Sequence, residues 1–250
     1  MGLSSFLQLK LAEVLLHGSA PVLCASIGRV ASARVHKALV QERSNAIFGF
    51  RRYEDQAFIR EAAWELKGVR FRRGAIYKTH DFPYDLVPSR RLKIVFLYGR
   101  PSDTILSLIR CYKTKGPGWM ERHFAHMHAD GDYAEILERD VLRIGEQIEA
   151  WSAVRHANVL GIRYGALWNH LDILNKFVGI EVNWPPFIER NFLDIDPATV
   201  AMARENYREL DLRESRLPDY FFSWPREAVA SKSPDANALK ICQERGPFGA

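Results

Sequence analysis

The sequence predicts an α/β fold in which a central, mostly parallel sheet is covered by helices on both faces. Short apolar runs typical of buried strands alternate along the chain with longer segments of helical periodicity. The clearest of these runs, residues 93–98, is apolar after its first residue, as expected for a strand with no solvent-exposed face. The chain has 250 residues, 47% of them hydrophobic, which is enough for a sizeable core. We therefore expect a three-layer sandwich, formed by a single domain over residues 1–250.

The individual elements follow from periodicity, caps and chain-breaking residues. Residues 1–18 are predicted to form an amphipathic helix, and Lys10 and Glu13 interrupt its apolar positions, so it is a poor signal peptide. Strands are predicted at 21–25, 74–78, 93–98 and 158–163, with the ambiguous segment 44–50 as a further short strand. Helices are predicted at 32–40, 54–67, 102–113, 133–156, 169–178 and 197–215, the last with Asp196 as N-cap and Pro197 in its first turn. A break is predicted at 116–118 after the helix 102–113, and a loop at 184–186. The polar tail 232–250 is predicted to be mobile or to fold over a site.

Charge and cysteine content restrict the classes of function. The net charge of +5 is small and scattered, which argues against nucleic-acid binding but suits a pocket for an anionic ligand. The three cysteines, Cys24, Cys111 and Cys242, lie far apart without metal-site spacing, which favours reduced thiols and a cytoplasmic location. No apolar run is long enough to span a bilayer, so we expect no transmembrane segment.

A lysine and a histidine mark the end of the strand predicted at 74–78. Side chains of a strand alternate between its two faces, so Lys78 and His80 should point to the same side. A histidine can remove the proton from a hydroxyl, and a lysine can stabilise an anionic group that is being transferred to it. The pair therefore predicts group transfer onto a hydroxyl.

A second candidate segment connects the first predicted strand to the helix that follows it. Backbone amides at a helix N-terminus bind phosphate or sulfate, and here Arg29 adds charge and Ser32 a hydroxyl. The Walker A pattern is absent. The simpler interpretation is an ordinary strand–helix connection with a solvated Arg29.

These segments resemble the cytosolic-type sulfotransferases. Lys78-Thr79-His80 with Pro83 and Leu86-Val87-Pro88 is similar to the family's Lys-Thr-His-x-Pro-x-x-Leu-Leu-Pro signature, with one residue more between His80 and Pro83. The segment 29–33 is similar to the 5′-phosphosulfate loop, with Ala31 and Ala33 where the family has glycine and a hydroxyl. Residues 94–107 resemble the 3′-phosphate motif, with Gly99 at the family's arginine position and Arg100 one place later. Residues 159–180 resemble the region whose tyrosine lies near the adenine.

The resemblance implies a P-loop NTPase-like sulfotransferase topology and a role for each matched residue. The enzyme would transfer a sulfonate from 3′-phosphoadenosine 5′-phosphosulfate (PAPS) to a carbohydrate or small alcohol, without a metal, and release adenosine 3′,5′-bisphosphate (PAP). His80 would be the general base, and Lys78 and Arg29 would stabilise charge on the sulfonate and the bridging oxygen. The implied nucleotide-binding residues are Gly28, Arg29, Val30, Ala31, Ser32, Ala33, Arg100, Ser107 and Tyr164.

Several alternatives remain open from the sequence. Arg34, Arg110 or Arg190 could replace Arg100, and Asp81, Glu54 or Asp55 could replace His80 as the base. The group His123, His126 and His128, with Asp130 and Asp132, lacks common zinc spacing and favours a solvated loop or an acceptor-binding lid, in which Trp119 stacks on a ring or fills the core. The rival functions are a Mg²⁺- and ATP-dependent kinase, and a non-catalytic protein of the same fold.

Overall fold

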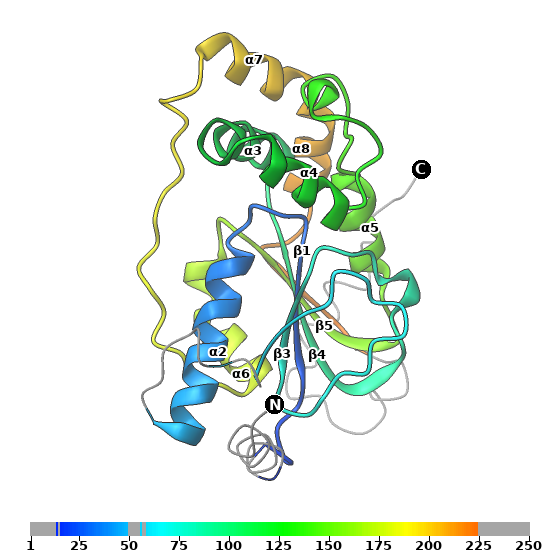
Figure 1. Cartoon of the computed structure of the whole chain (residues 1–250), viewed down its shortest axis with the longest axis vertical. Helices are drawn as coiled ribbons and strands as arrows, with labels where there is room; N and C mark the ends of the chain where they lie inside the picture. The colour runs from blue at the N-terminus through cyan, green and yellow to red at the C-terminus, as the bar shows by residue number, and fades with distance from the viewer. Residues whose placement is uncertain (1–13, 15, 50–55, 57–58, 225–250) are drawn as a thin grey trace.

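The computed structural model describes residues 14, 16–49, 56 and 59–224 (Figure 1). Most of the helix predicted over 1–18, and all of the tail 232–250, lie outside the described residues. None of the helices in the described part of the chain has the length and apolar character that a membrane span needs.

A six-stranded sheet forms the centre of the fold, in the order β2-β3-β1-β4-β5-β6. Its strands are β1 (Val22–Ser26), β2 (Arg60–Ala62), β3 (Ile76–Thr79), β4 (Ser89–Tyr98), β5 (Ala157–Arg163) and β6 (Tyr220–Ser223). The neighbours among β1 to β5 pair in parallel, and β6 pairs antiparallel with β5. All five side chains of β1 are buried, as expected for a strand covered on both faces. The α/β class with a mostly parallel sheet is therefore confirmed.

The helices occupy both sides of the sheet and the space beyond the carboxyl ends of its strands (Figure 1). On one side lie α2 (Ser32–Phe48) and α6 (Leu171–Val178), and on the other lies α5 (Ile144–Ala153). Beyond the carboxyl ends lie α3 (Pro101–Lys115), α4 (Pro117–His126), α7 (Pro197–Asn206) and α8 (Arg208–Ser215). Short 3₁₀ turns form at Pro83–Asp85 (η2), Tyr133–Glu135 (η3) and Leu167–Asn169 (η4). Residues 179–196 run along the outside of the molecule from α6 to α7, and we call this segment the strap.

The core lies between the sheet and α5 as well as between the sheet and α2. Trp151 on α5 is completely buried and stacks on Phe96 of β4, with ring centroids 5.7 Å apart. An aromatic side chain of this size removes about 150–250 Å² from water. The Trp151 indole N–H also donates a hydrogen bond to the Asp81 carbonyl over 3.2 Å, so the same residue fixes the loop that follows β3.

Two secondary-structure predictions near α2 are wrong. The segment 44–50 is not a strand, because α2 continues to Phe48 and ends at Gly49, whose positive φ of 72° suits a helix C-terminus. The segment 54–67 is not a helix in its described part, since Arg60–Ala62 forms the edge strand β2. Short apolar runs do not distinguish helix from strand, and here pairing with β3 decides.

Two further helix predictions failed at chain breaks. The helix predicted over 133–156 begins only at Ile144, where Asp140 accepts hydrogen bonds from the Ile144 and Gly145 amides. The helix break predicted at 116–118 is confirmed, because Gly116 ends α3, and Pro117 then starts α4. The helix predicted over 197–215 is interrupted at Tyr207, although Asp196 caps its start as predicted by accepting from the Thr199 amide at 2.9 Å.

Candidate functional site

The turn between β1 and α2 holds three residues in the left-handed backbone region. The φ angles are 78° at Gly28, 55° at Arg29 and 63° at Ala31. This region costs a non-glycine residue roughly 1–2 kcal/mol, and such strain is typical of ligand-binding turns. No side chain caps the start of α2 and its first turn has no acidic residue, so the first amides of the helix have no side-chain partner and no neighbouring carboxylate that would compete with an anion.

A pocket of about 670 Å³ opens at this turn, beyond the carboxyl ends of β1 and β3. Its walls come from the β1–α2 turn, the end of β3, α3, α4 and the strap. Among the described residues, six cationic side chains line it, against a single carboxylate, that of Glu189. The six are Arg29, Arg34, Lys78, Arg110, Arg122 and Arg190. Such a one-signed concave surface attracts anions.

Most of the residues singled out in the sequence meet in this pocket. Its lining includes Arg29, Ala31, Ser32, Ala33, Lys78, His80, Ser107 and Tyr164. Val30 is instead completely buried in the core, and Gly28 backs onto Met127 and His123. Glu54 and Asp55 lie outside the described residues.

Arg100 does not line the pocket. Its guanidinium lies 3.6 Å from the Asp211 carboxylate of α8, and its side chain is more than half exposed. The cause is the displacement by one residue from Gly99, since successive side chains after a strand point to opposite sides. The three alternatives Arg34, Arg110 and Arg190 all line the pocket. Arg110 also forms an ion pair with Asp194 of the strap.

His80 is 4% exposed and is held by hydrogen bonds on both its backbone and its ring. Its Nδ1 lies 3.0 Å from the Ser26 carbonyl oxygen and 3.0 Å from the Ser26 hydroxyl. A carbonyl only accepts, so we assign the ring proton to Nδ1, which leaves the Nε2 lone pair available. Gln147 on α5 donates to the His80 carbonyl over 3.1 Å. The imidazole is therefore held in the tautomer that a base at Nε2 requires.

Asp81, the alternative base, is engaged elsewhere. Its carboxylate accepts hydrogen bonds from the Leu66 and Phe82 amides, at 2.6 and 2.7 Å, and lies 3.0 Å from Nε2 of His128. It does not line the pocket. These contacts give Asp81 a structural role in the loop after β3.

Burial and nearby cations keep the pocket histidines neutral. The pKa of His80 is lowered well below its ordinary value, first by burial and then by Lys78 and His123. The pKa of His123 is lowered to about 3, by burial and then by Arg29 and Lys78. Burial also lowers the pKa of Lys78. At neutral pH these imidazoles are therefore unprotonated, and the positive charge of the pocket comes from its other basic side chains.

The strap is fastened to the turn after β1. Arg190 donates a hydrogen bond to the Arg29 carbonyl and lies over the ring of Tyr164, 4.0 Å from its centroid. Arg34 donates to the Pro186 carbonyl over 3.1 Å, and Arg29 donates from Nε to the Ser107 hydroxyl over 3.1 Å. From the sequence, Arg190 is only one of three alternatives, because its position beside the turn after β1 depends on the path of the strap. No local pattern reveals that path.

The three histidines of the segment 123–128 separate in the structure. His123 stacks on Trp119 and His126 stacks on Trp64, with centroid distances of 4.8 and 4.1 Å. His128 instead pairs with Asp81. No cluster of three potential metal ligands occurs within the described residues. The part of this segment that lies in α4 forms one wall of the pocket.

Buried histidines predict a pH dependence of stability. His36 is 4% exposed, and burial lowers its pKa from 6.5 to about 4, alongside the low pKa values of His80 and His123. The unfolded chain binds protons below pH 6.5 that the folded chain does not, so the free energy of unfolding should fall as the pH drops from about 6.5 toward 4. His36 alone accounts for about 3 kcal/mol at most.

Urea denaturation at several pH values measures this effect. In a His36→Gln variant, the fall of the unfolding free energy between pH 6.5 and 4.5 should be smaller than in the natural chain. An unchanged slope in the variant would show that His36 is not protonated in the way its burial implies.

No protein-family model matches the chain, and no curated protein matches it. A functional assignment therefore depends on the residues of the pocket and their geometry.

Proposed function

We propose that this chain is a sulfotransferase that moves a sulfonate from PAPS to an acceptor hydroxyl. One observation carries the proposal: Arg29, Lys78, His80 and Ser107, from three separate segments, line the same cation-rich pocket. We also propose the P-loop NTPase-like sulfotransferase topology. The strand order β2-β3-β1-β4-β5 supports it. The proposed anion-binding turn follows β1, which lies between β3 and β4. The next strands along the chain, β2 and β3, lie on one side of β1, and β4 and β5 lie on the other, so the turn is at a switch point of the sheet.

The residues of the pocket suit the nucleotide in size and charge. The volume of about 670 Å³ lies within the range of roughly 300–1,000 Å³ common for small-molecule sites. The first turn of α2 and the Ser32 hydroxyl would bind the 5′-phosphate. Ser107 with Arg190 would bind the 3′-phosphate, so Arg190 takes the part that the sequence first suggested for Arg100. Tyr164 would lie beside the adenine.

The chemistry follows from the positions of His80 and Lys78. PAPS supplies an activated sulfonate on a phosphate leaving group. A bond forms between the acceptor oxygen and sulfur, the bond from sulfur to the bridging oxygen breaks, and PAP leaves. His80 accepts the hydroxyl proton at Nε2, while Lys78 and Arg29 stabilise the charge that develops on the sulfonate and the bridging oxygen. The Ser26 carbonyl stabilises the imidazolium through Nδ1.

Titration calorimetry with PAP tests this proposal. We expect binding that does not depend on Mg²⁺, and an Arg190→Gln variant should bind PAP roughly tenfold or more weakly, because it loses a charge-assisted contact. Arg208→Gln, which removes the same charge from an exposed position on α8, serves as the matched control. A preference for ATP with Mg²⁺ would instead support the kinase alternative, and PAP binding without any sulfonate transfer would support a non-catalytic protein.

A further inference from the structure

The wall of the pocket formed by α4 presents a regular pattern of side chains. Trp119, Arg122, His123 and His126 follow the spacing i, i+3, i+4 and i+7, which places them on one helix face, and all four line the pocket. Gly116, with a φ of 76°, and Pro117 set the direction in which α4 leaves α3. The helix therefore covers the side of the pocket that contains His80.

Along this wall, aromatic rings lie between the proposed base, His80, and the cation Arg122. The Trp64 ring lies 5.7 Å from the His80 ring, and His126 stacks on Trp64 at 4.1 Å. Arg122 lies one helical turn before His126. An acceptor whose hydroxyl reaches His80 would therefore lie along these rings, with its far end near Arg122.

Arg122 differs from the other arginines of the pocket in what it contacts. Arg190 donates to the Arg29 carbonyl and Arg34 to the Pro186 carbonyl. Arg29 donates to Ser107 of α3, and Arg110 pairs with Asp194. Within the part of the chain that the structure describes, no carboxylate pairs with Arg122, and no carboxylate other than Glu189 of the strap lines the pocket. A cation in this position repels an amine-bearing acceptor and attracts an acidic one.

We propose that the acceptor is a hydroxy acid, and that Arg122 binds its carboxylate while the hydroxyl faces His80. This inference rests on the proposed sulfotransferase function and adds a specificity-determining residue to it. Lys78 lies 5.7 Å from the Trp64 ring centroid and contributes to the same positive potential. The rings of Trp64 and Trp119 provide apolar surface for the carbon skeleton of the acceptor.

Matched pairs of acid and methyl ester test the proposal on the PAP-loaded full chain. We would measure the binding of 4-hydroxybenzoate against methyl 4-hydroxybenzoate, and of glucuronate against its methyl ester, by calorimetry. At least one acid should bind about tenfold more tightly than its ester, the size expected for a charge-assisted hydrogen bond, and added salt should reduce the difference. The aromatic and sugar pairs also distinguish the two kinds of skeleton.

The variant Arg122→Gln should abolish this preference and leave PAP affinity unchanged, while Arg208→Gln should leave both unchanged. Equal binding of acid and ester in both pairs, absence of binding by all four compounds, or a preference that persists in Arg122→Gln would overturn the proposal. Failure of the sulfotransferase assignment is seen separately, either as absence of PAP binding in the titration that precedes addition of the acceptor, or as absence of sulfonate transfer from PAPS by a chain that binds PAP.

Discussion

Replacing His80 with alanine should lower sulfonate transfer about 10²–10⁴-fold, the usual contribution of a general base. The expectation follows from the orientation of the ring, whose Nδ1 is held by Ser26 while Nε2 remains available to the acceptor. The decrease should appear in kcat, because PAP and its phosphates do not require the imidazole. Single-turnover transfer from PAPS, measured with saturating nucleotide, isolates this step.

The His80 variant needs controls, because the ring is buried. Circular dichroism and PAP affinity should match those of the natural chain, and His17→Ala, which removes an exposed histidine, should retain full activity. Near-normal turnover of a folded His80→Ala protein would exclude His80 as the base. Asp81 would then be tested next, although its carboxylate is engaged by two backbone amides and His128, followed by Glu54 and Asp55.

The sequence predicts those parts of the fold that local patterns determine. The strand at 93–98 and the Asp196 cap depend on an apolar run and on a side chain reaching its own backbone, and both occur in the structure. The edge strands β2 and β6 were not predicted from the sequence. Most of their residues are partly buried or exposed. Pairing with a neighbouring strand, rather than a strong sequence pattern of their own, determines their positions.

In the candidate site too, local patterns predict the positions of some residues, and tertiary structure alone determines those of others. Lys78 and His80 share the pocket because the two-residue period of a strand holds wherever the strand lies. The side chain at 100 was harder to predict, since a shift of one residue moves it to the opposite side, toward Asp211. Arg190 reaches the turn after β1 from 161 residues away, and only tertiary structure brings these segments together.

Replacing Lys78 with methionine should reduce kcat about 10²–10³-fold, comparable to the loss of one preorganised donor to a developing charge. Methionine preserves much of the length and apolar surface of the lysine stem, which is largely buried beside Trp64. PAP affinity should change far less, because PAP lacks the sulfonate that Lys78 is proposed to contact. The measurements are single-turnover rates and PAP calorimetry on the same preparations.

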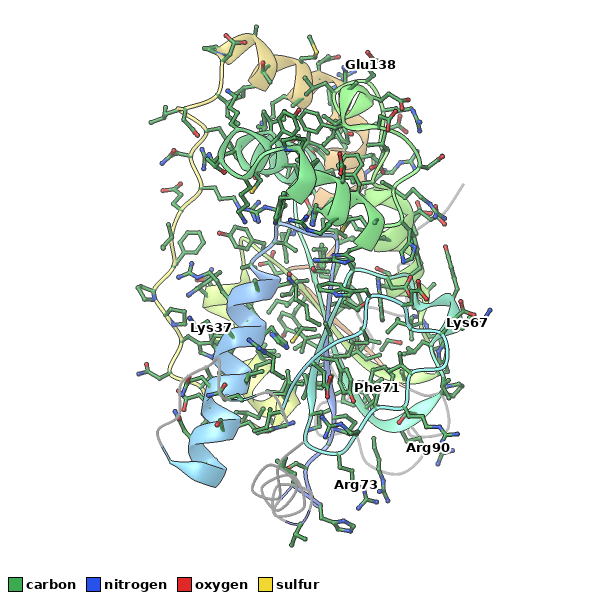
Figure 2. All side chains as sticks on the ribbon, viewed as in Figure 1. Lys37, Lys67, Phe71, Arg73, Arg90 and Glu138 are labelled. Atoms are coloured by element: carbon green, nitrogen blue, oxygen red, sulfur yellow. The ribbon has the colours of Figure 1, made fainter. Side chains whose placement is uncertain are left out.

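Lys67→Met is the matched control, since Lys67 is exposed and lies in the connection after β2 at the edge of the molecule (Figure 2). It should affect neither rate nor affinity. If Lys78→Met weakens PAP binding by the same factor as it slows transfer, Lys78 stabilises the bound nucleotide rather than the transition state. The charge on the sulfonate would then depend on Arg29, whose guanidinium is already oriented by the Ser107 hydroxyl and whose backbone lies in the strained turn after β1. The two outcomes thus decide whether Lys78 acts on the transferred group together with Arg29 or leaves that charge to Arg29.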